Sequence, residues 1–177
     1  MEVEDIENLI DEYGSYIYGF CRKLAINKDD SEDLYQQTFL KALEIRERID
    51  KNNNPKNFLI SISVNLWKNN IKKISRQNRI APSISNSDRV SIDILDSTIN
   101  IEAEVIYKDL EKNLNKVISL IKDKYRIPII MYYNAEMQIE EIAKALRVPS
   151  GTIKSRLFKG RKLIKKELEG LGYGEWE

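Results

Sequence analysis

Two stretches of the chain combine many cationic side chains with a complete lack of acids. Residues 51–87 hold seven lysines and arginines, and residues 142–166 hold nine, yet neither stretch contains an aspartate or a glutamate. The whole chain carries a net charge of only +1. Local charge density, and not net charge, sets how many counterions a protein releases from a polyanion. Two separate contacts with nucleic acid are therefore predicted. A solvated helix face is the simpler explanation of one basic run, but it is less satisfactory for two.

The sequence offers little for catalysis or metal binding. It has no histidine and one cysteine, which excludes a Ser-His-Asp triad, a Cys-His dyad, a Cys/His zinc site and an intramolecular disulfide. Cys21 follows Phe20 in an apolar helical stretch and is predicted to be a buried hydrophobic residue. No pair of carboxylates and no phosphate-binding loop stands out. We therefore predict no enzyme activity, no catalytic residue, no metal site and no cofactor.

The composition is that of a globular chain. Its 177 residues could form one medium domain or two small ones, and 42% apolar with 32% charged residues fits neither a disordered nor a membrane protein. No apolar run reaches the ~18 residues of a transmembrane helix. The chain opens with acids where a signal peptide carries basic residues. A cytoplasmic protein without membrane insertion is expected.

Helical periodicity predicts the elements that position the first basic stretch. Apolar residues recur at spacings of three and four over residues 5–26, over a second helix that ends near residue 45, and over residues 56–75. Leu40 is among the apolar residues of the second helix. Residues 50–55 contain three asparagines and a proline, and are predicted to be a loop. The second helix is expected to begin at a capping residue, which could be Asp29, Asp30 or Ser31.

Residues 76–101 lack this periodicity. They contain Pro82, several serines and asparagines, and single isoleucines, which is typical of a linker. A loop of this length inside one compact domain is uncommon, so two small domains joined by a tether explain it better. The predicted fold is all-α, with a helical domain over residues 1–75, a flexible linker over 76–101 and a second helical domain over 102–177.

The second domain is predicted to contain a helix-turn-helix. Its helices are expected over residues 101–122, 125–133, 137–146 and 150–168. Pro128 fits best in the first turn of its helix, and Ser150 can cap the last one. Gly160 would permit close packing of that helix. A short helix, a turn and a basic helix form the usual layout for insertion into the major groove. An ordinary helical hairpin with a lysine-rich surface is the alternative.

The outer side of the last helix would supply the groups that contact DNA. Its hydroxyls and cations can donate to phosphates and base edges, and its N-terminus offers free amides to a phosphate. The candidate residues are Ser150, Thr152, Lys154, Ser155, Arg156, Phe158, Lys159 and Lys162.

These residues carry a resemblance to a known family. Residues 133–168, above all IEEIA at 139–143 and VPSGTIKSRL at 148–157, closely resemble region 4 of extracytoplasmic-function sigma factors of the sigma-70 family. The resemblance implies that the second domain is region 4-like. It places the candidates from Thr152 to Lys159 on the minus thirty-five promoter element.

The first domain resembles region 2 of the same family. Residues 30–42 (DSEDLYQQTFLKA) look like region 2.2, which in the family binds the clamp helices of the beta-prime subunit of RNA polymerase. The resemblance implies a polymerase-binding face, and the predicted contacts are Asp33, Gln36, Gln37 and Phe39. Taken alone, the segment is equally well explained as a solvated acidic helix start.

Residues 58–73 resemble regions 2.3 and 2.4, which open and read the minus ten element. Binding to single-stranded DNA needs cations along the backbone and planar or amide groups near the exposed bases. The predicted contacts are Asn65, Trp67, Lys68, Asn69, Lys72 and Lys73. The resemblance also implies that Asn65 and the loop at 50–56 hold a flipped base. Trp67 could equally well lie in the core.

The resemblance spans about residues 6–168 and implies a sigma factor that directs core RNA polymerase to promoters. The implied partners are the beta-prime clamp helices, the beta flap, promoter DNA and an anti-sigma factor. Two other functions are weighed against it. One is a stand-alone helix-turn-helix transcriptional regulator, which would bind duplex DNA tightly by itself. The other is an anti-sigma or adaptor protein, against which the basic last helix argues.

Overall fold

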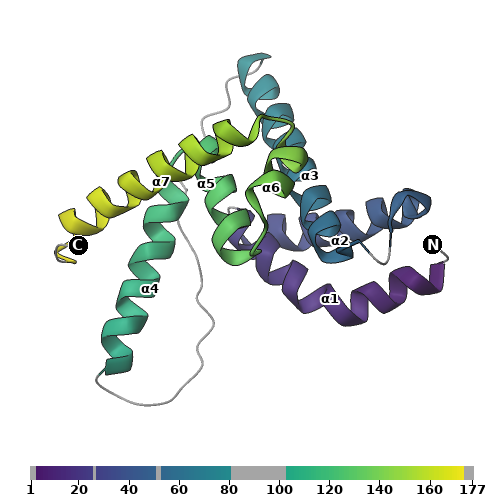
Figure 1. Cartoon of the computed structure of the whole chain (residues 1–177), viewed down its shortest axis with the longest axis horizontal. Helices are drawn as coiled ribbons and strands as arrows, with labels where there is room; N and C mark the ends of the chain where they lie inside the picture. Colours follow the sequence, from purple (N-terminus) through teal and green to yellow (C-terminus); the bar gives the residue numbers. More distant parts are fainter. Residues whose placement is uncertain (1–2, 26, 51–52, 81–102, 174–177) are drawn as a thin grey trace.

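The structure is a computed structural model, and it describes residues 3–25, 27–50, 53–80 and 103–173. The described residues form helices and short connections, without a β-strand, which confirms the predicted all-α fold (Figure 1). The α-helices are α1 (Val3–Leu24), α2 (Lys28–Glu44), α3 (Pro55–Ile80), α4 (Ala103–Leu120), α5 (Asp123–Ile129), α6 (Ile139–Leu146) and α7 (Ser150–Gly170). None of the helices described is long and apolar enough to cross a bilayer.

Helices α1, α2 and α3 form an N-terminal unit over the described part of residues 3–80. Their packing buries a set of aliphatic side chains that includes Ile17, Leu24, Leu59, Ile60 and Val64. Helix α3 continues five residues beyond the predicted end at residue 75. Residues 76–80 contain no glycine or proline, so nothing stops the helix before Pro82, which disfavours a helical residue just ahead of it. The rest of the predicted linker lies outside the described residues.

A small polar cluster sits inside the N-terminal unit. Thr38 on α2 and Ser63 on α3 are fully buried, and the Thr38 hydroxyl lies 3.0 Å from the Ser63 hydroxyl oxygen. Cys21 on α1 is buried beside them, as predicted. Burial raises the pKa of its thiol from 9.0 to about 11, and hydrogen bonds with Ser63 and Thr38 oppose this rise. Cys21 is therefore an unreactive part of the core.

The start of α2 differs from the prediction. The N-cap is Asn27, whose side-chain oxygen accepts a hydrogen bond of 2.8 Å from the backbone N–H of Asp30. The predicted caps Asp29, Asp30 and Ser31 are wrong, because all three are already helical. Asn27 has the extended backbone that a cap requires, and the two aspartates then lie in the first turn, where the helix dipole favours acids.

Helices α4 to α7 form a C-terminal unit over residues 103–173, in which α7 packs on α4, α5 and α6. The expectation for Pro128 is wrong, because this residue lies near the end of α5 and not in its first turn. The missing N–H removes only a bond to the carbonyl of Lys124, near the exposed start of the helix. The chain then continues as a π-helical turn, η2 (Ile130–Asn134), closed by the Ala135 N–H on the Ile130 carbonyl at 3.2 Å.

The two units pack against each other, with α6 beside α3 and η2 beside α1 (Figure 1). Arg126 of α5 is 6% exposed and donates to the carbonyls of Lys23 and Leu24 at the end of α1, at 3.3 and 3.0 Å. The Tyr16 hydroxyl donates to the Asn134 carbonyl at 2.6 Å. Most of the buried apolar side chains form one connected cluster across both units. The division of the chain near residues 75 and 102 stays a prediction.

Candidate nucleic-acid interface

Helices α6 and α7 and the turn between them form the predicted helix-turn-helix. The Glu141 carboxylate accepts a hydrogen bond of 2.8 Å from the backbone N–H of Gln138, the N-cap of α6. Arg147 ends α6 in the left-handed conformation, with φ 56° and ψ 50°. The N-cap of α7 is Pro149, so the predicted cap Ser150 is wrong by one residue and is itself the first residue of the helix.

The inner side of α7 holds it close to the rest of the C-terminal unit. Ile153 and Leu157 are buried there. Gly160 is also buried, and a Cβ at this position would lie 2.5 Å from the Cδ1 of Ile129 on α5. A Cβ here would force the end of the Ile129 side chain to shift, so glycine lets α7 lie close to α5 without that adjustment. The inner side therefore fixes the direction in which the outer side of α7 points.

The outer side of α7 is open. Of the eight residues predicted to contact DNA, five are exposed and three are partly buried. The exposed residues are Lys154, Ser155, Phe158, Lys159 and Lys162, and the partly buried ones are Ser150, Thr152 and Arg156. None of the cations in this set forms an ion pair with any residue that the structure describes. The Lys162 amine lies 4.8 Å from the centre of the Phe158 ring. The positive charge on this face is thus available to an external anion.

The second predicted DNA face lies along α3 and is partly covered. Asn65 and Lys68 are half-buried, whereas Asn69, Lys72 and Lys73 are exposed. The side-chain N–H of Asn65 donates a hydrogen bond of 2.8 Å to the Ser61 carbonyl, and the side-chain oxygen of Asn65 takes no part in that bond. Trp67 is 3% exposed. The structure therefore favours the core alternative for Trp67, and its indole cannot stack on a base without leaving the core.

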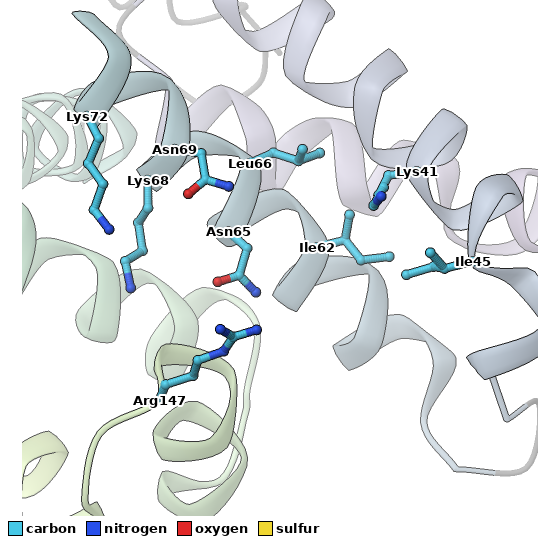
Figure 2. Close-up of a pocket in the computed structure, with 9 residues that line it drawn as sticks. All are labelled: Lys41, Ile45, Ile62, Asn65, Leu66, Lys68, Asn69, Lys72 and Arg147. Carbon is cyan, nitrogen blue, oxygen red and sulfur yellow. The ribbon is translucent and has the colours of Figure 1, made fainter. Parts of the chain in front are cut away.

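The α3 face meets the helix-turn-helix at a cavity of about 370 Å³. Asn65, Lys68 and Lys72 of α3 lie on one side, and Arg147 approaches them from the C-terminal unit (Figure 2). Partial burial lowers the pKa of Lys68, and the neighbouring cations Lys72, Arg156 and Arg147 lower it further. Positive groups of the two units therefore face each other across this cavity.

The face of α2 predicted to bind polymerase is exposed in part. Asp33, Gln36 and Gln37 are exposed, whereas Phe39 is 7% exposed and packs edge-on against Tyr35, with ring centres 5.1 Å apart. Phe39 is thus a core residue in this structure. Leu40, one of the apolar residues that marked this helix in the sequence, is 66% exposed. Its position three residues after Gln37 could have indicated the outer face.

Comparisons with known proteins match both halves of the chain. The family described as Sigma-70 region 2 matches residues 9–77, and the family described as Sigma-70, region 4 matches residues 112–164. The ECF RNA polymerase sigma factor SigW of Bacillus subtilis is 26% identical over 166 residues, which is 93% of this chain and 89% of SigW. The RNA polymerase sigma factor HrpL of Pseudomonas syringae pv. syringae is 31% identical over 156 residues, 85% of this chain and 79% of HrpL.

Two solved structures have a similar fold. The sigma factor RpoE of Bartonella quintana, in complex with the anti-sigma factor NepR, superposes with a TM-score of 0.72 at 21% identity and covers 94% of this chain and 98% of RpoE. CnrH, in complex with the cytosolic domain of CnrY, gives a TM-score of 0.64 at 14% identity, with 96% of this chain and 90% of CnrH covered. At these identities the likeness concerns the fold.

Proposed function

The chain belongs to the sigma-70 family and is a sigma factor of the extracytoplasmic-function type, and we propose how its exposed faces divide the work of transcription initiation. A sigma factor directs RNA polymerase to specific promoters. The N-terminal unit would bind core polymerase and open the minus ten element. The C-terminal unit would bind the minus thirty-five element and the beta flap. The observation that carries this proposal is the open face of α7 on a helix-turn-helix, where Lys154, Arg156, Lys159 and Lys162 form no ion pair with any described residue.

We assign the outer face of α7 to the minus thirty-five duplex. An α-helix fits the major groove when one side packs on its own domain and the other presents donors. Lys154 and Arg156 lie near the N-terminal end of α7, which is the end that enters the groove in helix-turn-helix proteins. Lys159 and Lys162 follow one and two turns later, where they can reach phosphates. Phe158, 53% exposed, can contact an apolar base edge.

The exposed amides and cations of α3 are assigned to the minus ten strand. Lys68, Lys72 and Lys73 can follow a phosphate backbone, and Asn65 and Asn69 can pair with the edges of unstacked bases. Trp67 is left out of this set because it is buried. The face of α2 formed by Asp33, Gln36, Gln37 and Leu40 is assigned to core polymerase, with Leu40 as its apolar contact.

The two promoter faces cannot be used together in the arrangement of Figure 1. Elements named minus thirty-five and minus ten lie about 25 base pairs apart, or roughly 85 Å of duplex at 3.4 Å per base pair. In the structure, Lys68 of the α3 face and Arg147 beside the α7 face line one cavity. The two units must therefore separate when the chain binds a whole promoter.

A protein partner that masks these faces is also proposed. RpoE and CnrH, which share the fold, were each solved with a bound protein, and NepR is named as an anti-sigma factor. By extension, this chain would be held inactive by an anti-sigma factor. We attribute no catalysis to the chain itself, and we place its action in the cytoplasm, beside polymerase and promoter DNA.

Reconstituted transcription tests the proposal. Core polymerase with this protein should initiate from a cognate promoter selected with the reconstituted holoenzyme, and core polymerase alone should not. A stand-alone regulator would instead bind naked duplex tightly and form no complex with core polymerase. The matches to both region 2 and region 4 do not favour that alternative. Failure to form a stable complex with core polymerase would contradict the proposed function.

A further inference from the structure

The cavity between α3 and the helix-turn-helix, here called the junction cavity, has the features of a ligand site. Its volume of about 370 Å³ lies within the range of small-molecule pockets. Its lining comes from both units, mostly from α2 and α3 and, across the gap, from Arg147. One end is polar, with Asn65, Lys68 and Lys72 near Arg147 (Figure 2). The other end is lined by the aliphatic side chains of Ile45, Ile62 and Leu66 and by Lys41, whose amine pairs with Glu44 at 2.9 Å.

The polar end is strongly cationic and has no counter-charge. No carboxylate is among the residues that line the cavity. Lys68, Lys72 and Arg147 form no ion pair with any residue in the described part of the chain. Lys68 is disfavoured as a cation by its burial and by the three positive groups around it. Packing of the two units thus brings like charges together, and a bound anion would relieve their repulsion.

Arg147 adds an independent observation. Its backbone is left-handed, a conformation that glycine and asparagine adopt at the end of a helix at much lower cost than arginine. A strained residue that persists at such a position suggests a use for its side chain. The guanidinium of Arg147 extends from the turn toward Asn65 and Lys68 on the other unit (Figure 2). A planar guanidinium is suited to paired hydrogen bonds with phosphate oxygens.

We propose that the junction cavity binds a nucleoside di- or triphosphate, which joins α3 to the turn between α6 and α7. The phosphates lie among Lys68, Lys72 and Arg147. The base lies toward Ile62 and Leu66, with the amides of Asn65 and Asn69 as hydrogen-bonding partners at its edge. Three cations suit a chain of linked phosphates better than a single one, and an apolar end suits a base better than solvent.

Such a ligand would regulate the chain by population shift. Because it contacts both units, it binds only when they are packed together and favours that arrangement by its differential affinity. It also occupies Asn65, Lys68 and Lys72, which are assigned above to the minus ten strand. The site itself does not rest on that assignment, since binding is expected for the free chain without polymerase or DNA.

The test is a titration of the full-length chain with ADP and, separately, with inorganic pyrophosphate, at fixed ionic strength. Arg147→Asn removes the guanidinium and retains a residue that tolerates the left-handed backbone, so the variant should fold. Lys144→Asn is the matched control, because Lys144 is an exposed residue of α6 outside the cavity and its loss changes the net charge equally.

We expect saturable binding of one ADP per chain, weakened about tenfold or more by Arg147→Asn and less than twofold by Lys144→Asn. Pyrophosphate should bind more weakly than ADP, because it lacks a base for the apolar end. Absence of saturable binding at millimolar ADP would overturn the proposal. Equal weakening by the two variants would do the same, since it would indicate general attraction to a basic surface, and so would equal affinity for pyrophosphate and ADP.

Discussion

Helices α3 and α7 both carry a dense run of basic residues, but the two runs differ in how exposed they are in the tertiary structure. On α7, Lys154, Lys159 and Lys162 are exposed and form no ion pair with any described residue. Along α3, Lys68 is half-buried and faces Arg147 and Arg156 of the other unit. The same kind of sequence thus gives one face, on α7, that is largely open and one face, on α3, that is open at Asn69, Lys72 and Lys73 but partly covered at Asn65 and Lys68.

The difference shows that a basic run predicts charge but not access. Both runs are free of acids, so the sequence predicts a polyanion contact equally well for each of them. Access depends on the neighbouring unit, which is held in part by contacts outside both runs and in part by the Asn57 side-chain amide, which donates to the Glu141 carboxylate at 2.9 Å. The buried Arg126 and the Tyr16 hydroxyl carry two of these contacts. Changes at those contacts should therefore alter the α3 face more than the exposed α7 residues Lys154, Lys159 and Lys162.

The largest effect, on the free energy of unfolding, is expected for Arg126→Ala, which removes contacts that hold the C-terminal unit against the N-terminal unit and so over α3. The Arg126 guanidinium contacts the Lys23 and Leu24 carbonyls and pairs with Asp123 at 2.9 Å. Its loss removes this donor from the buried carbonyl of Leu24 and the partly buried carbonyl of Lys23, and leaves Asp123 without its ion pair, so the free energy of unfolding should fall by about 2–4 kcal/mol in urea denaturation. Lys112→Ala, at an exposed site on α4, should cost less than about 0.5 kcal/mol.

A fall of under about 1 kcal/mol for Arg126→Ala would mean that the junction is weak, and the contrast between α3 and α7 would then be small. As a second measurement, the variant should expose Lys68 more to a lysine-modifying reagent. The modification of Lys159 on α7 should stay unchanged, because that residue is exposed already.

The next effect concerns the buried side of α3, where Ser63 meets Thr38 and Cys21. The folded chain holds the thiol proton of Cys21 more tightly than the unfolded chain, because the pKa is raised from 9.0 to about 11. The resulting stability is fully present below pH 9.0 and is lost as pH rises toward about 11. Wild type should lose about 2–3 kcal/mol more than Cys21→Ala over this window. Denaturation curves that run parallel from pH 8 to 11 would place the thiol in a solvated environment.

The smallest effect is expected for substitutions on α7, and it tests whether the exposed cations of this helix bind promoter DNA. Arg156→Ala and Lys154→Ala should each weaken binding of the holoenzyme to the minus thirty-five element by about 1–3 kcal/mol if the side chains contact bases. Lys166→Ala, an exposed residue near the C-terminal end of the same helix, should have a smaller effect. Fluorescence anisotropy at constant salt measures all three. Unchanged occupancy in both Arg156→Ala and Lys154→Ala would remove them from the proposed interface.

The sequence determined which segments are helical and where the charges lie. Apolar spacing predicted each α-helix in the part of the chain that the structure describes, because each amphipathic helix needs one apolar stripe for burial. The ends were less certain, since capping is decided by one residue and its backbone angles. Asn27 and Pro149 were therefore missed as caps, and the end of α3 was placed five residues early.

Only the tertiary structure decided which of the predicted site residues can be reached. Helical spacing alone does not decide whether the side chains of Trp67, Phe39 and Leu40 face the core or the solvent. In the structure Trp67 and Phe39 are buried in the core, and Leu40 is exposed on the surface. Arg147 came next to Lys68 only because the two units pack together. Helical periodicity is a local property of the chain, whereas burial and charge proximity depend on neighbours that are distant in sequence.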